Sequence, residues 1–506
     1  MKKDEDLEAK LLAAGEAPAK ADAAGNAYAL VCALLASLAS IIYGYNRGVM
    51  SGAQKYVQED LGVSDGQLEV LIGLTSVYSL VGSLAAGWAC DRAGRRRTVA
   101  LAAALFLAGS AVTAAANGYA ALMAGQLLAG VACGFGLVVA PVYIAEIAPA
   151  ASRGFLSSIP EIAGNSGILL SYIADFALAG LPKTLNWRIM IGIGAVPPLF
   201  LAASALLVMP ETPRWLVLHG HLDGARRVLA RTTGDAAAAD RRMQEIVASV
   251  QEASKQQAGD GGGSPPATTS VWREILLRPT PAVRRVMLAI TGLQFFQQAC
   301  GVAAMVLYAP RVFGRAGVTS ERAVLGATVL LGAAKTVAIV VPLFLADRLG
   351  RRPMLLASAA GMAASLLVLG LSLHAPPAVA AASWWAAATC VAAAAAYMAT
   401  FSLGFGPVIW MYGSEILPLR LRAQGTGIGT ALNRVMSAVV GMTFISMYEA
   451  VGMAGSFFIF AAFSAAAYVF VYAYLPETKG KSLEEMEVLF DGRAAGSSSP
   501  QALPSS

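Results

Sequence analysis

The sequence is poor in charged residues and in histidine. Asp, Glu, Lys and Arg make up only 13% of its 506 residues, whereas a soluble protein has about a quarter. Its three histidines, His219, His221 and His374, lie in segments that we predict to be loops. No nucleophile–base pair and no set of metal ligands is visible, so the sequence argues against an enzyme, a metal site or a bound cofactor.

Cysteine is also scarce, and its placement argues against a disulfide framework. An odd number of cysteines without close pairs is typical neither of disulfide-stabilised domains nor of metal sites. We predict that they pack between helices, because all of them lie within or at the ends of apolar spans: Cys32, Cys90, Cys133, Cys300 and Cys390.

Long apolar runs, by contrast, are abundant. Hydrophobic residues make up 57% of the chain, and runs of about 20 residues are long enough to cross a hydrocarbon core about 30 Å thick. We predict an all-α membrane protein with twelve transmembrane helices. Their approximate ranges are 27–52, 68–90, 97–116, 119–142, 155–179, 187–209, 285–309, 323–346, 353–373, 381–412, 423–447 and 453–475.

The chain has a net charge of +6, and its basic residues are unevenly distributed among the loops. Arg and Lys gather in alternate loops, as at 92–97 and 348–352, and the other short loops hold few. By the positive-inside rule, both termini and the long central loop are cytosolic. The basic excess therefore indicates membrane topology and not a nucleic-acid partner.

The sequence also contains an internal repeat of charged motifs. DRAGRR at 91–96 and DRLGRR at 347–352 each lie between two apolar spans. Glu146 and Glu415 begin a second pair of motifs, and Glu211 and Glu477 belong to a third, at nearly the same spacing along the chain. Two six-helix pseudo-repeats with charged clusters on one side are typical of a rocking-bundle transporter.

We predict that these charged residues form a cytosolic gate, whose ion pairs hold the two halves together and break when the protein opens inward. The alternative is that they serve only as topological signals. The predicted gate residues are Asp91, Arg92, Arg96, Glu146, Arg153, Glu211, Asp347, Arg348, Arg352, Glu415, Arg422 and Glu477.

The repeat predicts two bundles joined by a polar segment. Within that segment, 222–233 and 237–256 have helical character. The predicted parts are a cytosolic N-terminal tail at 1–26, a six-helix bundle at 27–209, a cytosolic central loop at 210–284, a six-helix bundle at 285–475 and a cytosolic C-terminal tail at 476–506.

Several motifs, in order, resemble the sugar porter family of the major facilitator superfamily: PVYIAEIAPAASRG, PETPRWL, GFGPVIW, SEILPLRLRAQG and PETKG. The resemblance covers about residues 27–490 and implies the major facilitator fold. Phe295–Ala299, Gly154–Leu156 with Pro160-Glu161, and GAAKT around Lys335 resemble the plant polyol and monosaccharide carriers more than the hexose carriers.

The resemblance implies a sugar site made by Gln297, Gln298, Trp410 and Asn433. The residue types fit this role, because amides both donate and accept hydrogen bonds and an aromatic ring suits the apolar face of a sugar. Taken without the motif, the glutamine pair could equally be amides that pack between helices.

Two charges fall within predicted transmembrane helices, Glu161 and Lys335. A charge in mid-membrane costs about 2.5–3.5 kcal/mol, so it usually faces a cavity or a partner. The resemblance maps both onto the substrate site, and we predict that they line it and pair when it is empty. The alternatives are a structural ion pair or a snorkelling lysine.

The sequence departs from the family pattern at three positions. Proton-coupled members of the family carry Asp on helix 1 and Arg on helix 4, where this chain has Asn46 and Gln126. A carboxamide does not titrate near neutral pH, so Asn46 cannot carry the proton. Ala303 replaces a polar residue of the substrate site.

Three functions remain open at this stage. The first is an alternating-access carrier of a small polyol or monosaccharide, facilitative because of Asn46, at the plasma membrane. The second is a symporter that uses Glu161, with protons as a further partner, and the third is a membrane sensor that binds sugar without transport. Besides substrate, we expect the lipid bilayer as a partner and no nucleic acid, and an oligomer is not required.

Overall fold

A computed structural model describes residues 2–149, 152–233, 236–258, 275, 279–374, 384–417 and 421–479. Within these ranges the secondary structure is entirely helical. The chain divides into two compact units, Met1–Gly259 and Asp260–Ser506, and each is described by itself.

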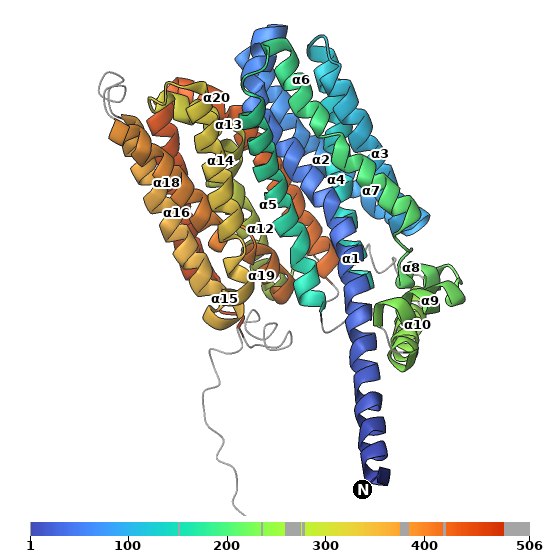
Figure 1. Ribbon diagram of the computed structural model, residues 1–506. Coiled ribbons are helices and arrows are strands. Elements are labelled where there is room, and N and C mark those ends of the chain that lie inside the picture. The colour runs from blue at the N-terminus through green and yellow to red at the C-terminus, as the bar shows by residue number, and fades with distance from the viewer. Residues whose placement is uncertain are drawn as a thin grey trace, which may run out of the picture. The chain divides into compact units, whose positions relative to one another are not determined.

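The N-terminal unit begins with the long helices α1 to α5, which the helices α6 to α10 follow (Figure 1). Helix α1 begins at Lys2, so the segment predicted as an N-terminal tail continues the first transmembrane helix in the same direction. The helices are α1 (Lys2–Leu61), α2 (Asp65–Ala93), α3 (Arg95–Ala114), α4 (Tyr119–Ile147), α5 (Arg153–Leu178), α6 (Lys183–Ile193), α7 (Val196–Leu207), α8 (Pro213–Leu218), α9 (Leu222–Thr233) and α10 (Ala236–Ala258).

The C-terminal unit has more interrupted helices. Its last helix, α20, contains a non-helical residue, Gly452, with a φ of 79°. The helices are α12 (Pro281–Ala299), α13 (Val302–Arg315), α14 (Glu321–Ala338), α15 (Val341–Leu349), α16 (Arg351–His374), α18 (Trp384–Leu403), α19 (Val408–Ile416) and α20 (Arg422–Tyr474).

Ten helical segments among the described residues are long and apolar enough to cross a membrane. Helix α5 is not among them, because Glu161, Asn165 and Asp175 lower its hydropathy, but it packs along α1 as a further long helix. Because Gly452 divides α20 into two, the helices match the predicted twelve spans, six in each unit. The all-α fold of two six-helix halves is confirmed.

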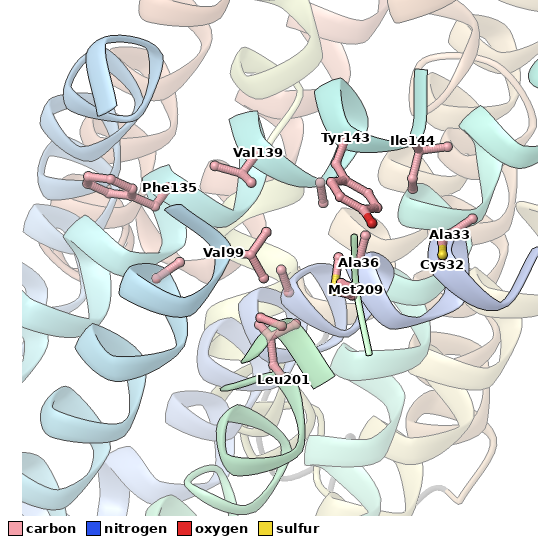
Figure 2. Packing of buried hydrophobic residues seen from close by; sticks show 14 of the residues in the cluster. Cys32, Ala33, Ala36, Val99, Phe135, Val139, Tyr143, Ile144, Leu201 and Met209 are labelled. Carbon is pink, nitrogen blue, oxygen red and sulfur yellow. The ribbon is translucent and has the colours of Figure 1, made fainter. Parts of the chain in front are cut away.

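The core of the N-terminal unit is built on small side chains of α1. Cys32, Ala33 and Ala36 are fully buried, and they belong to the same cluster as Tyr143 of α4 and Leu201 of α7 (Figure 2). Small residues let helix backbones approach closely, which is how transmembrane helices gain packing energy in a solvent as apolar as their own side chains. All five cysteines are buried and free, as predicted for residues that pack between helices.

Candidate substrate site and charged clusters

Two helical spans of the C-terminal unit are interrupted along their length. Pro281–Arg315 is interrupted at Gly301, whose φ of 87° is left-handed and suits glycine. Trp384–Ile416 is interrupted at 404–407, where Pro407 has no N–H to donate. Each interruption frees backbone carbonyls in a region where hydrocarbon offers no hydrogen-bond partner.

Side chains satisfy these carbonyls across the two interruptions. The Nε2 of Gln297, on α12, donates to the carbonyl oxygens of Phe405 and Gly406, at 2.7 and 3.0 Å. In return, the hydroxyl of Tyr397, on α18, donates to the carbonyl oxygen of Cys300 at 2.8 Å. The glutamine that the sequence assigned to substrate therefore also joins one interrupted helix to the other.

A network of four buried amides surrounds this junction. The Nδ2 of Asn433, on α20, donates to the Oε1 of Gln297 at 2.6 Å and to that of Gln294 at 2.9 Å. Its Oδ1 accepts from the Nε2 of Gln298 at 3.2 Å. All four side chains belong to residues that are at least 94% buried. The network brings together three of the predicted substrate residues.

One acceptor of the network is left over. The Oε1 of Gln298 is buried and has no hydrogen-bond partner in the described part of the chain. An unsatisfied buried acceptor costs about 1–3 kcal/mol, and a hydroxyl group that donates to it would recover that energy. The network carries no charge, so it suits a neutral solute with several hydroxyl groups.

The other predicted substrate residues of this unit lie near helix ends. Trp410 is half-buried in the first turn of α19, directly after the interruption at 404–407. Ala303 is fully buried at the start of α13. Lys335 is half-buried in the last turn of α14. The part of these three residues in a substrate site stays a prediction.

Glu161 belongs to the N-terminal unit, on α5. Its side chain is exposed, and the Nδ2 of Asn165 donates to its Oε1 at 3.3 Å and to its backbone carbonyl at 2.8 Å. The predicted pairing with Lys335 would join the two units and stays a prediction.

Asn46 and Gln126, the two positions predicted to bear on proton coupling, are uncharged and lie on α1 and α4 of the N-terminal unit. Asn46 is half-buried on α1. Gln126 is buried on α4, and its Oε1 accepts a hydrogen bond from the hydroxyl of Thr75 on α2, at 3.3 Å. The amide at 126 thus has a hydrogen-bond partner on a neighbouring helix.

The charged motifs of the N-terminal unit fold into one cluster, here called the N-terminal charged cluster. The guanidinium of Arg95 pairs with Glu146 at 2.9 Å, and both side chains are nearly buried. The carboxylate of Glu211 accepts from the backbone N–H groups of Arg95, Arg96 and Thr212, at 2.9 to 3.2 Å. Burial raises the pKa of the Glu211 carboxyl, and these N–H groups oppose the rise.

The C-terminal charged cluster repeats this arrangement. The guanidinium of Arg351 pairs with Glu415 at 2.8 Å. The carboxylate of Glu477 accepts from the backbone N–H groups of Arg351 and Arg352, at 3.0 and 3.1 Å. The other carboxylate oxygen of Glu415, Oε2, accepts from the hydroxyl of Thr478 at 2.6 Å. The sequence repeat is therefore a repeat of hydrogen bonds, and the ion pairs of both clusters join elements within one unit.

Several predicted gate residues lie at the edge of the clusters. The guanidinium groups of Arg96, Arg352 and Arg422 donate to backbone carbonyls, chiefly those of Ala205, Tyr472 and Leu417. Those of Arg92, Arg153 and Arg348 belong to exposed residues, and the exposed Asp91 approaches Arg95 at 3.6 Å. The side chain of Asp347 lies outside the described residues.

The sequence prediction missed the residues at the centre of these sites. The ion-pairing arginines are Arg95 and Arg351, and their signal is their place directly after the glycine of each motif. Gln294 precedes the glutamine pair by one helical turn, and this spacing indicates that all three side chains lie on the same face of α12. Tyr143 and Tyr412 each donate a hydroxyl to the proline carbonyl of a PET motif, at 3.0 and 2.9 Å, and only an alignment of the two repeats would have paired them.

The geometry agrees with what the chain is similar to. The family model described as "Sugar (and other) transporter" matches residues 32–490. Polyol transporter 5 of Arabidopsis thaliana is 46% identical over 469 residues, which are 92% of this chain and 87% of that protein. The inward-open xylose transporter XylE from E. coli has a TM-score of 0.74 at 26% identity, over 91% of this chain and 99% of that one. XylE described as a proton:xylose symporter bound to 6-bromo-6-deoxy-D-glucose has a TM-score of 0.70, also at 26% identity, over 92% and 99%.

The charged clusters generate a prediction for the two motif glycines. Gly94 and Gly350 have φ values of 92° and 95°, and a Cβ atom would lie 2.3 Å from Glu211 Oε2 and 2.8 Å from Glu477 Oε2. Each Gly→Ala substitution should cost about 1–3 kcal/mol and lower the melting temperature in detergent. Gly87→Ala is the matched control, because nothing lies within 4 Å of a Cβ atom there. Equal melting temperatures for Gly94→Ala and Gly87→Ala would show that the charged cluster does not require glycine at position 94.

A second prediction concerns the buried ion pair of Arg95 and Glu146. Glu146→Ala removes the close, nearly buried partner of the Arg95 guanidinium and leaves, among the described residues, only the exposed Asp91 at 3.6 Å, so we expect a loss of about 3–5 kcal/mol in unfolding free energy. The same substitution at Asp240, whose pair with Arg226 is 45% and 66% exposed, should cost under about 1 kcal/mol. Chemical denaturation of both variants measures the difference. If Arg95→Met did not recover part of the loss in Glu146→Ala, the buried charge would not be its cause.

Proposed function

The chain belongs to the family of sugar (and other) transporters, and on that premise we propose that it carries a small polyol or monosaccharide down its gradient without coupling to protons. It is a multi-pass membrane protein and a transmembrane carrier. We further propose that it resides in the plasma membrane with both termini in the cytosol, that it catalyses no reaction, and that a monomer is sufficient for transport.

The observation that carries the choice of substrate is the amide network with its open acceptor. A polyol can donate a hydroxyl to the Oε1 of Gln298 and accept from amide N–H groups, which an apolar solute cannot do. A charged solute would find no opposite charge in the amide network. The names of the relatives point the same way, since one is called a polyol transporter and another was solved with a glucose derivative. Trp410 would supply an aromatic surface for the C–H face of the substrate.

The proposed absence of proton coupling rests on Asn46 and Gln126. A proton-driven carrier needs a group that binds and releases a proton during the cycle, and a carboxamide has none at neutral pH. When both members of a charge pair are replaced, neither leaves an unpaired charge behind in the membrane. The hydrogen bond that Gln126 accepts from Thr75 supports a structural role for this uncharged side chain. XylE, by contrast, is described as a proton:xylose symporter.

A second candidate is a symporter that uses Glu161. Its carboxylate is exposed on α5 and accepts a hydrogen bond from the amide of Asn165. A carboxyl group, unlike the carboxamide of Asn46, belongs to a class of side chain that serves as a proton carrier. The third candidate, a sensor without transport, has no supporting feature beyond the binding site itself.

The charged clusters have a role in the proposed cycle. Buried ion pairs and carboxylates that accept backbone N–H groups hold the ends of α2, α3 and α4 in one unit, and of α15, α16 and α19 in the other. Each half would therefore rock as a rigid body. We propose that the exposed arginines of the same motifs form and break the contacts between halves that the gate requires.

Uptake of labelled polyols and hexoses into proteoliposomes tests the coupling. We expect the internal concentration to reach the external one and to stop there, with or without an imposed pH gradient. Accumulation above equilibrium driven by the gradient would contradict the facilitative carrier, and its loss in Glu161→Gln would establish the second candidate. Binding without flux would favour the sensor.

Asn46→Asp with Gln126→Arg is the informative gain-of-function variant, because it restores the charges of coupled relatives.

Substitution in the amide network tests the site. Gln298→Ala removes the open acceptor and should raise the KM for substrate by about 5- to 150-fold, because one hydroxyl loses its partner. The substitution also unpairs the Oδ1 of Asn433 but removes the Oε1 of Gln298, which has no partner among the described residues, so these two effects on stability oppose each other and the melting temperature should change little. Asn433→Ala should affect both quantities, and Gln244→Ala, an exposed amide on α10, should affect neither. An unchanged KM in Gln298→Ala would exclude the assignment.

A further inference from the structure

A cavity of about 560 Å³ lies where the start of α12 meets the end of α20 and the first turn of α16. All its lining residues belong to the C-terminal unit. The residues used below are Arg284, Arg285, Leu288, Arg352, Tyr472 and Tyr474. The cavity is separate from the amide network, whose four residues do not line it.

The charge of the cavity has one sign. Three arginines line it, and none of its lining residues is acidic. Arg284 and Arg285 lie in the first turns of α12, whose N-terminus adds the positive end of the helix dipole. A cavity of this kind would attract an anion, and phosphate oxygens match the donors of a guanidinium.

The guanidinium of Arg352 is held in position by Tyr472, and its Nε is left without an acceptor in the described part of the chain. Its Nη2 donates to the carbonyl oxygen of Tyr472 at 2.7 Å, and its Cζ lies 5.5 Å from the centre of the Tyr472 ring. Its Nε is buried and has no hydrogen-bond partner among the residues that the structure describes. A buried guanidinium nitrogen without an acceptor costs energy, and an anionic oxygen would satisfy it.

The equivalent position in the N-terminal unit lacks these features. There the Nε of Arg96 donates to the carbonyl oxygen of Ala205 at 2.7 Å and is therefore satisfied. Counting back from the two PET motifs, Tyr472 and Tyr474 correspond to Leu206 and Val208. The two halves share the charged cluster, but at this position the C-terminal half has two tyrosines and an Nε on Arg352 that is unpaired among the described residues, whereas the N-terminal half has aliphatic residues and a paired Nε on Arg96.

The rim of the cavity is apolar and aromatic and faces outward. Leu288 is 48% exposed, and Tyr472 and Tyr474 are 64% and 60% exposed. Exposed tyrosines at the end of a transmembrane helix are typical of the level of lipid headgroups. Arginine-rich cavities between helices at that level suit phosphate-bearing headgroups.

We propose that this cavity binds the headgroup of an anionic phospholipid. The headgroup phosphate accepts from Arg352 and from one or both arginines of α12, and the acyl chains lie along the exposed side chains of Leu288 and the tyrosines. A soluble phosphate compound would use the same donors but would gain nothing from the apolar rim. The proposal does not depend on the substrate or on the coupling of transport.

The test uses the purified full-length chain in detergent at fixed ionic strength, with thermophoresis as the readout. The probes are dioctanoyl phosphatidylinositol 4-phosphate, dioctanoyl phosphatidylcholine and the free headgroup, inositol 1,4-bisphosphate. We expect saturable binding of the first probe, and binding at least about tenfold weaker for the other two. Equal binding of the free headgroup would show a site for soluble phosphates, and equal binding of phosphatidylcholine would show a purely apolar contact; either result overturns the proposal.

Variants locate the site. Each arginine near an anionic headgroup is worth about fivefold in affinity, so Arg284→Gln with Arg285→Gln should weaken binding about thirtyfold. Arg226→Gln with Arg227→Gln, another exposed arginine pair on α9, should bind like the unmodified chain. Arg284→Lys with Arg285→Lys keeps the charge and should bind within about threefold. Unchanged binding in the glutamine pair, or a loss as large in the lysine pair or in the control pair, would overturn the proposal.

Discussion

Hydrocarbon supplies no hydrogen-bond partner, so every backbone N–H and C=O within a membrane span must be satisfied by the protein itself. An uninterrupted helix meets this requirement without help from side chains. The spans at 281–315 and 384–416 do not, because each contains an interruption that frees carbonyl oxygens. Gln297 and Tyr397 supply the missing donors, each from the other span. The polar chemistry of the candidate site thus exists because the helices are broken there.

This constraint explains why the amides serve the fold and still leave an acceptor without a partner among the described residues. Gln297 uses its N–H donors on backbone carbonyls, while its Oε1 accepts from Asn433, and Asn433 in turn accepts from Gln298. The chain of hydrogen bonds ends at the Oε1 of Gln298, which has no partner in the described residues. A fully satisfied network would hold the fold and bind nothing. The network here leaves at least one buried acceptor, the Oε1 of Gln298, without a partner among the described residues.

The charged clusters hold helix ends together, and both units do so with the same few residue types. In both units an arginine directly after a glycine pairs with a glutamate, and a second glutamate accepts from backbone N–H groups at the start of the next helix. The left-handed glycine lets the carboxylate approach, since a Cβ atom at Gly94 or Gly350 would collide with it. Duplication preserved this arrangement, while the surroundings diverged at Arg96 and Arg352.

The sequence by itself determined the number and order of the spans, because a bilayer needs runs of about 20 apolar residues and the chain shows them directly. It also indicated the repeat, the family and the uncharged pair Asn46 and Gln126. It did not indicate that α1 continues to Lys2, because no apolar run covers that segment. Nor did it select Arg95 and Arg351 from their arginine-rich motifs, or add Gln294 to the amides. Only the tertiary structure decided those pairings, because a hydrogen bond depends on which side chains meet across helices that are distant in sequence, and composition and spacing along one helix leave that contact undefined.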